Sequence, residues 1–186
     1  SAIKGSMPEI TEIKQQVKQA NRYSVYVDGT YGFSLSEPQL LSSGVYKGLE
    51  LTAQQVESLK QDSDVGKLFD RVLNLFSYRM RSEWEVRDYL RRKQAGEHAD
   101  MLVARMQKLG YINDETFARS WIENRRLGKP TSQRKLRAEL QAKRIDSSVI
   151  DKVLEEDAGQ TDEITILQEL VAKKRARYPD DTKFMQ

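Results

Sequence analysis

Apolar residues follow helical spacing along most of this chain and alternate with polar residues only near its beginning. From Val65 to residue 156, apolar positions recur every three or four residues, as expected for one face of an α-helix. Between residues 23 and 35, two runs rich in β-branched and aromatic side chains flank Asp28 and Gly29. This pair is typical of a tight hairpin turn, because glycine tolerates a positive φ. The pattern predicts a mainly α protein with a small N-terminal β-hairpin or sheet module and one or two short helices before Val65.

Helix start and stop signals divide the helical region into units of three helices. Ser82 and Glu85 form the Ser-x-x-Glu pattern of a capping box, and Thr131 or Ser132 is placed to cap the corresponding helix of a second unit. A link at residues 155–162 is expected before a third unit, and the first six residues resemble an expression scar. The predicted domains are a β-rich module at 7–62, a three-helix repeat at 63–112, a second repeat at 113–157 and an incomplete third repeat at 158–186.

The middle helices of the two units repeat one another in sequence. Ser132 follows Ser82 by 50 residues, and Arg, Leu and Lys recur at the same offset, with Val86 answered by Leu136. A period of this size indicates one supersecondary unit used in tandem. Because the repeated helix carries arginine and lysine, the units are expected to build an extended cationic surface that binds a polyanion or an acidic protein.

Charge is concentrated in the helical part of the chain. Residues 68–186 carry 24 Lys and Arg against 20 Asp and Glu, whereas residues 1–67 carry 7 against 8. The interpretation as a binding surface requires that the cations share one side and are not engaged by internal carboxylates. The residues expected to contact DNA or a protein partner are Arg79, Arg81, Arg87, Arg91, Arg92, Lys93, Arg125, Arg126, Lys129, Arg134, Lys135, Arg137 and Lys143.

The residues that usually carry catalysis are scarce. The chain of 186 residues has no cysteine and a single histidine, His98, and it has no glycine-rich phosphate loop. Carboxylates in the first turns of helices are explained by the helix dipole. We therefore expect no catalytic residue, metal or cofactor, and a protein that is not an enzyme. The absence of cysteine and of a stretch of about 18 apolar residues predicts a cytoplasmic protein without a membrane partner.

Two tryptophans invite a nucleic-acid interpretation, since aromatic rings can stack on bases. Trp121 shares an apolar stripe with Phe117, so that packing in the core is favoured for it. Trp84 lies off the stripe of Val86 and Leu90 and is the better candidate for a contact.

Four stretches in this order resemble the RecX family of regulators of the bacterial RecA recombinase, in particular its N-terminally extended forms. They read RYSVYVDG at 22–29, LFSYRMRSEWEVR at 75–87, LGYINDETFA at 109–118 and GKPTSQRKLRAEL at 128–140. Two departures stand out. Arg144 follows Lys143 where the family usually has glycine in a tight turn, and the chain reaches Gln186 where the second helix of a third repeat is expected to begin.

The resemblance implies tandem three-helix repeats that form an elongated, curved body in the groove of the RecA–DNA filament. Besides the RecA filament, the expected partners are single- and double-stranded DNA, which the basic residues bind through phosphate without sequence preference, and the protein is expected to be a monomer. Its expected effect is to restrain filament growth, ATP hydrolysis, strand exchange and the SOS coprotease activity, within homologous recombination and DNA repair.

Three other functions stay open on the sequence alone. Tandem three-helix units also occur in proteins that bind duplex DNA directly. A scaffold whose basic helices bind an acidic protein without nucleic acid is a second alternative. A nuclease that holds Mg²⁺ with carboxylates is a distant third.

Overall fold

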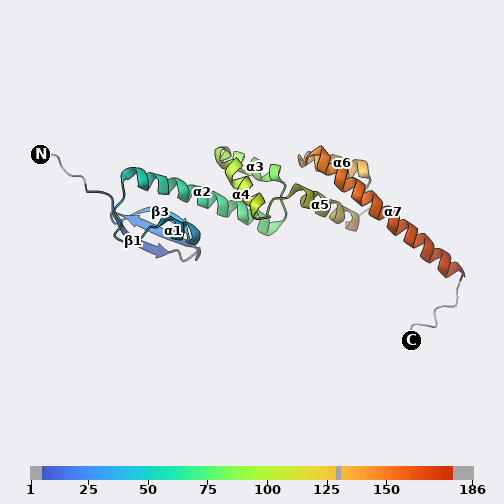
Figure 1. Cartoon of the computed structure of the whole chain (residues 1–186), viewed down its shortest axis with the longest axis horizontal. Helices are drawn as coiled ribbons and strands as arrows, with labels where there is room; N and C mark the ends of the chain where they lie inside the picture. The colour runs from blue at the N-terminus through green and yellow to red at the C-terminus, as the bar shows by residue number, and fades with distance from the viewer. Residues whose placement is uncertain (1–5, 129–130, 178–186) are drawn as a thin grey trace, which may run out of the picture. The chain divides into compact units, whose positions relative to one another are not determined.

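The computed structural model describes residues 6–128 and 131–177, which form two compact units, 1–79 and 80–186 (Figure 1). The first unit contains an antiparallel three-stranded sheet and two helices, and the second is helical throughout its described part. The prediction of a mainly α protein with an N-terminal β module and tandem three-helix repeats is confirmed.

The sheet of the first unit has the order β1–β2–β3, formed by Ile10–Gln15, Arg22–Val27 and Thr30–Ser36. The predicted hairpin joins β2 to β3, and its turn residues Asp28 and Gly29 have φ values of 51° and 79°. Both values are positive, as a type I′ turn requires. Apolar side chains on one face of the sheet form a core with two residues of the segment 44–52, which comes later in the chain. This core comprises Ile10, Val25, Phe33, Leu35, Val45 and Leu51.

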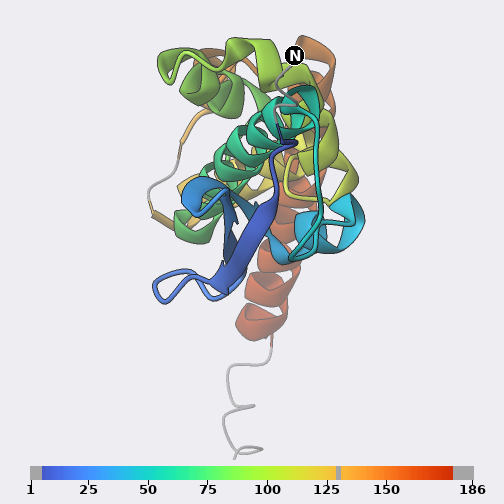
Figure 2. The ribbon, with the colours of Figure 1, turned by 90° about the vertical axis from the view of Figure 1, so that its left-hand side faces the viewer.

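Two helices follow the sheet, α1 at Glu37–Ser43 and α2 at Ala53–Tyr78. Figures 1 and 2 show α2 running beside the sheet, where the hydroxyl oxygen of Ser63 accepts a hydrogen bond from the Ser34 amide at 3.2 Å. The sequence predicted a short helix here and a separate one from Val65, which is wrong because α2 is continuous. Ser63 in the polar segment is buried against β3, so that this segment packs as part of the helix. The boundary predicted at residues 62/63 therefore falls inside a helix.

The second unit contains α3 (Glu83–Arg92), a 3₁₀ turn η1 (Gly96–His98), α4 (Ala99–Lys108), α5 (Asp114–Gly128), α6 (Gln133–Ala142) and α7 (Ser147–Arg177). Helices α5, α6 and the first part of α7 enclose one core, to which Phe117, Leu136, Leu140 and Ile150 contribute. Trp121 packs partly buried against this core, as its place on the apolar stripe predicted.

Helix α7 corrects the predicted link at residues 155–162. It continues through Gly159 without a break, and on its far part Leu167 and Val171 are exposed. An isolated glycine destabilises a helix only modestly, and Asp157 in this segment pairs with Arg126 of α5, so that the segment packs as part of the helix. Composition alone therefore does not make this segment a linker.

Candidate functional site

Helices α3 and α6 are structurally equivalent, and each carries three of the cations singled out from the sequence. Both span ten residues, 50 positions apart, and each begins at a serine whose hydroxyl accepts a hydrogen bond from the third helical amide. Val86 and Leu90 in α3 are fully buried, as are Leu136 and Leu140 in α6. The repeat seen in the sequence is thus a repeat of structure.

Both helices also end in the same way. Gln94 and Arg144 adopt left-handed φ values of 57° and 58°, and the amides of Ala95 and Ile145 donate to the carbonyl oxygens of Leu90 and Leu140. This is the Schellman geometry that usually recruits glycine. Arg144, the residue that departs from the family pattern, therefore makes the tight turn without glycine, as its counterpart Gln94 does.

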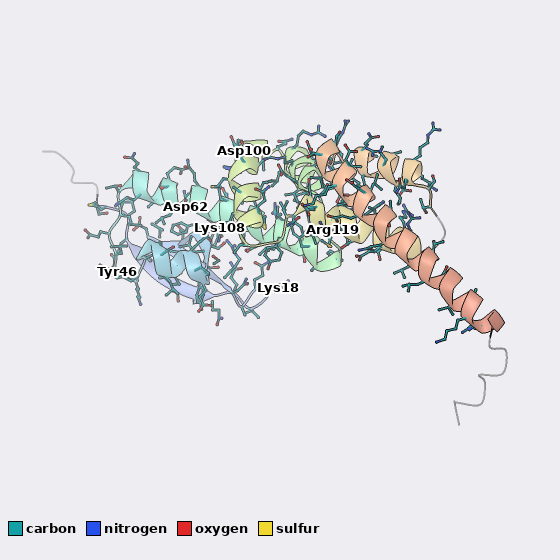
Figure 3. All side chains as sticks on the ribbon, turned by 45° about the vertical axis from the view of Figure 1, so that its right-hand side comes forward. Lys18, Tyr46, Asp62, Asp100, Lys108 and Arg119 are labelled. Carbon is teal, nitrogen blue, oxygen red and sulfur yellow. The ribbon has the colours of Figure 1, made fainter. Side chains whose placement is uncertain are left out.

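The recurring arginines Arg87 and Arg137 connect the second helix of each three-helix repeat to the third helix of that repeat. Arg87 donates to Glu83 in its own helix and to Asp100 at the start of α4, both at 2.7 Å; Asp100 is labelled in Figure 3. Arg137 donates to Asp151 in α7 at 2.6 Å. The hydrogen bond with Asp100, followed by that with Glu83, raises the pKa of Arg87.

The cations at the end of α3 face one carboxylate. Asp88 pairs with Arg91 at 2.5 Å and with Arg92 at 2.9 Å, and its side chain is only 16% exposed. The hydrogen bond from Arg91, helped by the charge of Arg92, lowers the pKa of Asp88. Lys93 follows, with its ammonium 5.8 Å from the ring centroid of Tyr89.

Trp121 organises a second group of cations around its ring. Arg125 and Lys143 lie 5.0 and 5.2 Å from the ring centroid, within the range of cation–π attraction. The indole N–H donates to Glu139 at 2.8 Å, and Arg125 donates to the same carboxylate at 2.9 Å. Trp121 is therefore enclosed by protein groups.

Lys143 also connects the two repeats. Its ammonium lies 2.8 Å from Glu85 in α3, and its carbonyl oxygen accepts a hydrogen bond from the Ser82 hydroxyl at 3.3 Å. At the same junction the amide of Glu83 donates to Asp114 at 2.8 Å. Burial raises the pKa of Asp114 more than this amide lowers it. The N-terminal end of α3 is thus closed by the second repeat.

The N-terminal end of α6 is open by contrast. Ser132, Arg134 and Lys135 are exposed, and neither cation has a carboxylate partner among residues 6–128 and 131–177. Nearby, Arg126 pairs with Asp157 at 2.5 Å, which raises the pKa of Arg126. Lys129 lies outside the described residues, and Arg79 and Arg81 lie in the segment between the end of α2 and the start of α3.

These contacts correct the expectation that the cations are not engaged by internal carboxylates. Ion pairs within the described residues involve Arg87, Arg91, Arg92, Arg125, Arg126, Arg137 and Lys143. The pairing of Asp88 and Glu83 with arginines could be predicted from the sequence, because each carboxylate precedes its arginine by three or four residues on one helix. Asp100, Asp151 and Asp157 lie on other helices, and no local pattern signals them.

No group of three His, Asp or Glu side chains in residues 6–128 and 131–177 is placed to hold a metal ion. Within the same residues, every helix is too short or too polar to cross a bilayer.

Three family models match successive parts of the chain. The regulatory protein RecX N-terminal domain matches residues 8–52, the first RecX three-helix domain matches 69–106, and the second matches 113–154. The first three-helix match takes in the last part of α2, so that the helix contributes to both predicted domains.

Curated relatives extend the likeness to most of the chain. Regulatory protein RecX of Oceanobacillus iheyensis is 32% identical over 174 residues, which are 90% of this chain and 64% of the relative. That of Listeria innocua is 34% identical over 152 residues, 81% of this chain and 56% of the relative. The chain thus spans about three fifths of the length of these relatives.

A solved structure supports the same assignment. The crystal structure of a regulatory protein RecX superposes with a TM-score of 0.73 at 25% identity, covering 94% of this chain and 85% of that one. The matches follow the order of the units along the chain, from the sheet module to the second three-helix repeat. This chain therefore belongs to the RecX family of regulatory proteins.

Proposed function

We propose that this protein is a non-enzymatic regulator that binds the RecA–DNA filament and restrains the activities of the recombinase. Family membership supports a regulatory role, and the observation that carries the proposal is the open N-terminal end of α6. There Arg134 and Lys135 are exposed without a carboxylate partner among the described residues, at the helix end where the dipole also favours an anion.

The proposed contact is with phosphate rather than with bases. Two exposed cations on one helical turn neutralise charge without reading sequence, and such contacts make binding salt-dependent. The paired cations have a secondary part in this proposal. Phosphate has to compete with Asp88, Asp100 or Asp151 for their guanidinium groups, so they contribute to the field around the helices more than to direct contacts.

The test is the single-strand-dependent ATP hydrolysis of RecA, with the protein added at stoichiometric amounts. Unchanged protein is expected to lower the rate, and Arg134→Glu/Lys135→Glu is expected to lose most of the effect. The matched control is Lys47→Glu/Lys60→Glu, which makes the same change in net charge at exposed positions in the first unit. An unchanged rate of hydrolysis with the unmodified protein contradicts the proposal.

Binding to bare duplex separates this function from direct action on DNA. If the protein binds duplex tightly with a sequence preference and RecA activity does not respond, then the duplex-binding alternative replaces the proposal. Affinity for an acidic protein that ignores polynucleotide favours the scaffold instead.

A further inference from the structure

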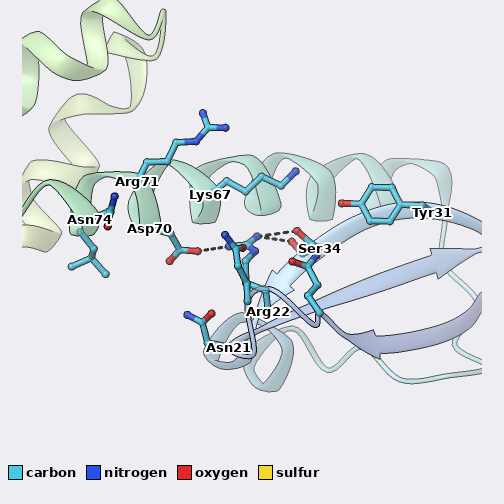
Figure 4. A pocket seen from close by; sticks show the side chains of 11 residues that line it. Asn21, Arg22, Tyr31, Ser34, Lys67, Asp70, Arg71 and Asn74 are labelled. Atoms are coloured by element: carbon cyan, nitrogen blue, oxygen red, sulfur yellow. Dashed lines mark hydrogen bonds and ion pairs between the residues drawn. The ribbon is translucent and has the colours of Figure 1, made fainter. Parts of the chain in front are cut away.

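The first unit contains a polar cleft between the sheet and α2 (Figure 4). Its volume is about 770 Å³, within the range of roughly 300–1,000 Å³ that is common for ligand sites. The loop between β1 and β2, the strands β2 and β3, and the second half of α2 line it. All of its lining residues belong to one compact unit, so the cleft is a feature of the N-terminal module alone.

An ion pair between Arg22 and Asp70 forms the floor of the cleft, and its two charges neutralise each other. The Arg22 side chain is 3% exposed, and its Nη1 lies 2.5 Å from Asp70 Oδ2. Its Nη2 donates to the carbonyl oxygen and to the hydroxyl of Ser34 at 3.1 and 3.0 Å. This ion pair, with its buried guanidinium and these hydrogen bonds, holds β2, β3 and α2 together and supplies a rigid base for the groups above it.

The rim of the cleft carries excess positive charge. Arg71 is exposed and has no ion pair among the described residues, and Lys67, one turn earlier on α2, has only the highly exposed Asp64 at 3.4 Å. Over residues 1–79 the chain has nine Lys and Arg against nine Asp and Glu. The cleft therefore concentrates cations in a module that is neutral as a whole.

One end of the cleft offers an aromatic surface. Tyr31 is 53% exposed, its ring meets Tyr26 edge-on with centroids 6.2 Å apart, and Figure 4 shows its hydroxyl directed toward Ser34. The side-chain amides of Asn21 and Asn74 also line the cleft. Amides both donate and accept hydrogen bonds, which suits the edges of unpaired bases, and an exposed ring suits stacking.

We propose that this cleft binds a short segment of a single strand. Lys67 and Arg71 hold a phosphate, Tyr31 stacks on a base at one end of the cleft, and the amides of Asn21 and Asn74, which lie toward the other end (Figure 4), meet the edge of a neighbouring base. The site is separate from the end of α6 and does not require any action on RecA. A free nucleotide has the same chemistry as a unit of a strand, and the strand is favoured because the cleft is open and its cations lie on the rim.

The experiment measures binding of a fluorescein-labelled 12-nucleotide single strand by anisotropy, without RecA. It uses the 186-residue chain with Arg134→Glu/Lys135→Glu, so that binding at α6 is removed. Adding Tyr31→Ala is expected to weaken binding about fivefold or more. Adding Arg71→Glu is expected to weaken it and to lower the slope of log affinity against log salt by about 0.7. Lys47→Glu is the matched control, at an exposed residue of the same module that does not line the cleft.

Two further measurements fix the place and the source of the ligand. Crosslinking with a strand that carries 5-iododeoxyuridine is expected to label the peptide containing Tyr31, and an unlabelled strand is expected to compete where an equal concentration of mononucleotide does not. The proposal would be overturned if the Tyr31→Ala and Arg71→Glu proteins bound the strand as tightly as their parent protein does. Crosslinks confined to residues beyond 79 would also overturn it. Equal competition by mononucleotide would overturn the strand as the source. Because RecA is absent throughout, these results do not depend on the proposed regulation.

Discussion

The N-terminal ends of α3 and α6 have the same backbone and opposite surroundings. Each begins at a capping serine, Ser82 or Ser132, with nearly equal dihedral angles. Ser82 is completely buried at the junction with the second repeat, whereas Ser132 is exposed. The first turn of α3 carries Glu83 and Glu85, and that of α6 carries Arg134 and Lys135.

The comparison teaches that one supersecondary unit can serve two purposes according to what covers its helix end. In α3 the acidic turn receives Lys143 from the neighbouring repeat, so its charge contributes to assembly of the unit. In α6 the same turn is basic and open, so its charge is available to an external anion. A sequence repeat therefore predicts common structure more securely than common function.

The largest expected effect is on stability, and it concerns the buried leucine that α3 and α6 share at equivalent positions. Leu90→Ala and Leu140→Ala each remove a fully buried side chain, and each is expected to lower the free energy of unfolding by about 2–5 kcal/mol. Urea denaturation followed by circular dichroism measures the loss. Leu127→Ala, at a residue 85% exposed, is the control and should change stability by less than about 0.5 kcal/mol. A small loss at only one of the two leucines would show that the repeats differ in their cores.

The next effect concerns the two capping serines. Ser132→Ala removes a cap in solvent and is expected to cost about 0.5–1 kcal/mol. Ser82→Ala also removes the hydrogen bond from this buried hydroxyl to the Lys143 carbonyl oxygen, so a loss of about 1–3 kcal/mol is expected. Denaturation of both variants under the same conditions gives the difference. Equal costs would mean that the junction does not distinguish the two helix ends.

Lys135→Glu gives α6 the capping box of α3 and is expected to act in opposite directions on stability and binding. A glutamate three residues after Ser132 completes the capping pattern and complements the helix dipole, which should stabilise the protein by about 0.5 kcal/mol. Loss of one phosphate contact should lower the slope of log affinity for single-stranded DNA against log salt by about 0.7. Thermal melts and anisotropy titrations measure the two. Binding that is unchanged would remove α6 from the proposed interface.

The smallest expected effect is that of low pH on the ion pairs of Asp88 with Arg91 and Arg92 at the end of α3. Because the folded pKa of Asp88 is lowered, its contribution to stability is present above the unfolded pKa of about 3.9 and is lost as pH falls through the folded value. Asp88→Ala, which copies Ala138 of α6, should flatten the dependence of stability on pH below about 4. It should also release Arg91 and Arg92 and thereby strengthen salt-sensitive binding to DNA. Denaturation across pH and anisotropy at neutral pH test both; weaker binding would contradict the masking role of Asp88.

The local features of the fold could be predicted from the sequence because they depend on neighbours along the chain. The Asp28–Gly29 turn, the serine caps and the buried stripe of Leu136 and Leu140 all follow from residue type and short spacing. Helix continuity was the weak point: α2 and α7 pass through polar segments where breaks were expected. Whether such a segment stays helical depends on what packs beside it, as Ser63 shows.

The binding surface was only half determined by the sequence. The chain itself fixed which residues are cationic and that they recur at an interval of 50 positions. Tertiary packing decided that Arg87, Arg126 and Arg137 face Asp100, Asp157 and Asp151, and that Arg134 and Lys135 remain exposed. The physical reason is range: capping and helical periodicity act within one or two turns, whereas a charge is neutralised by whichever carboxylate the fold brings within about 4 Å, however distant in sequence.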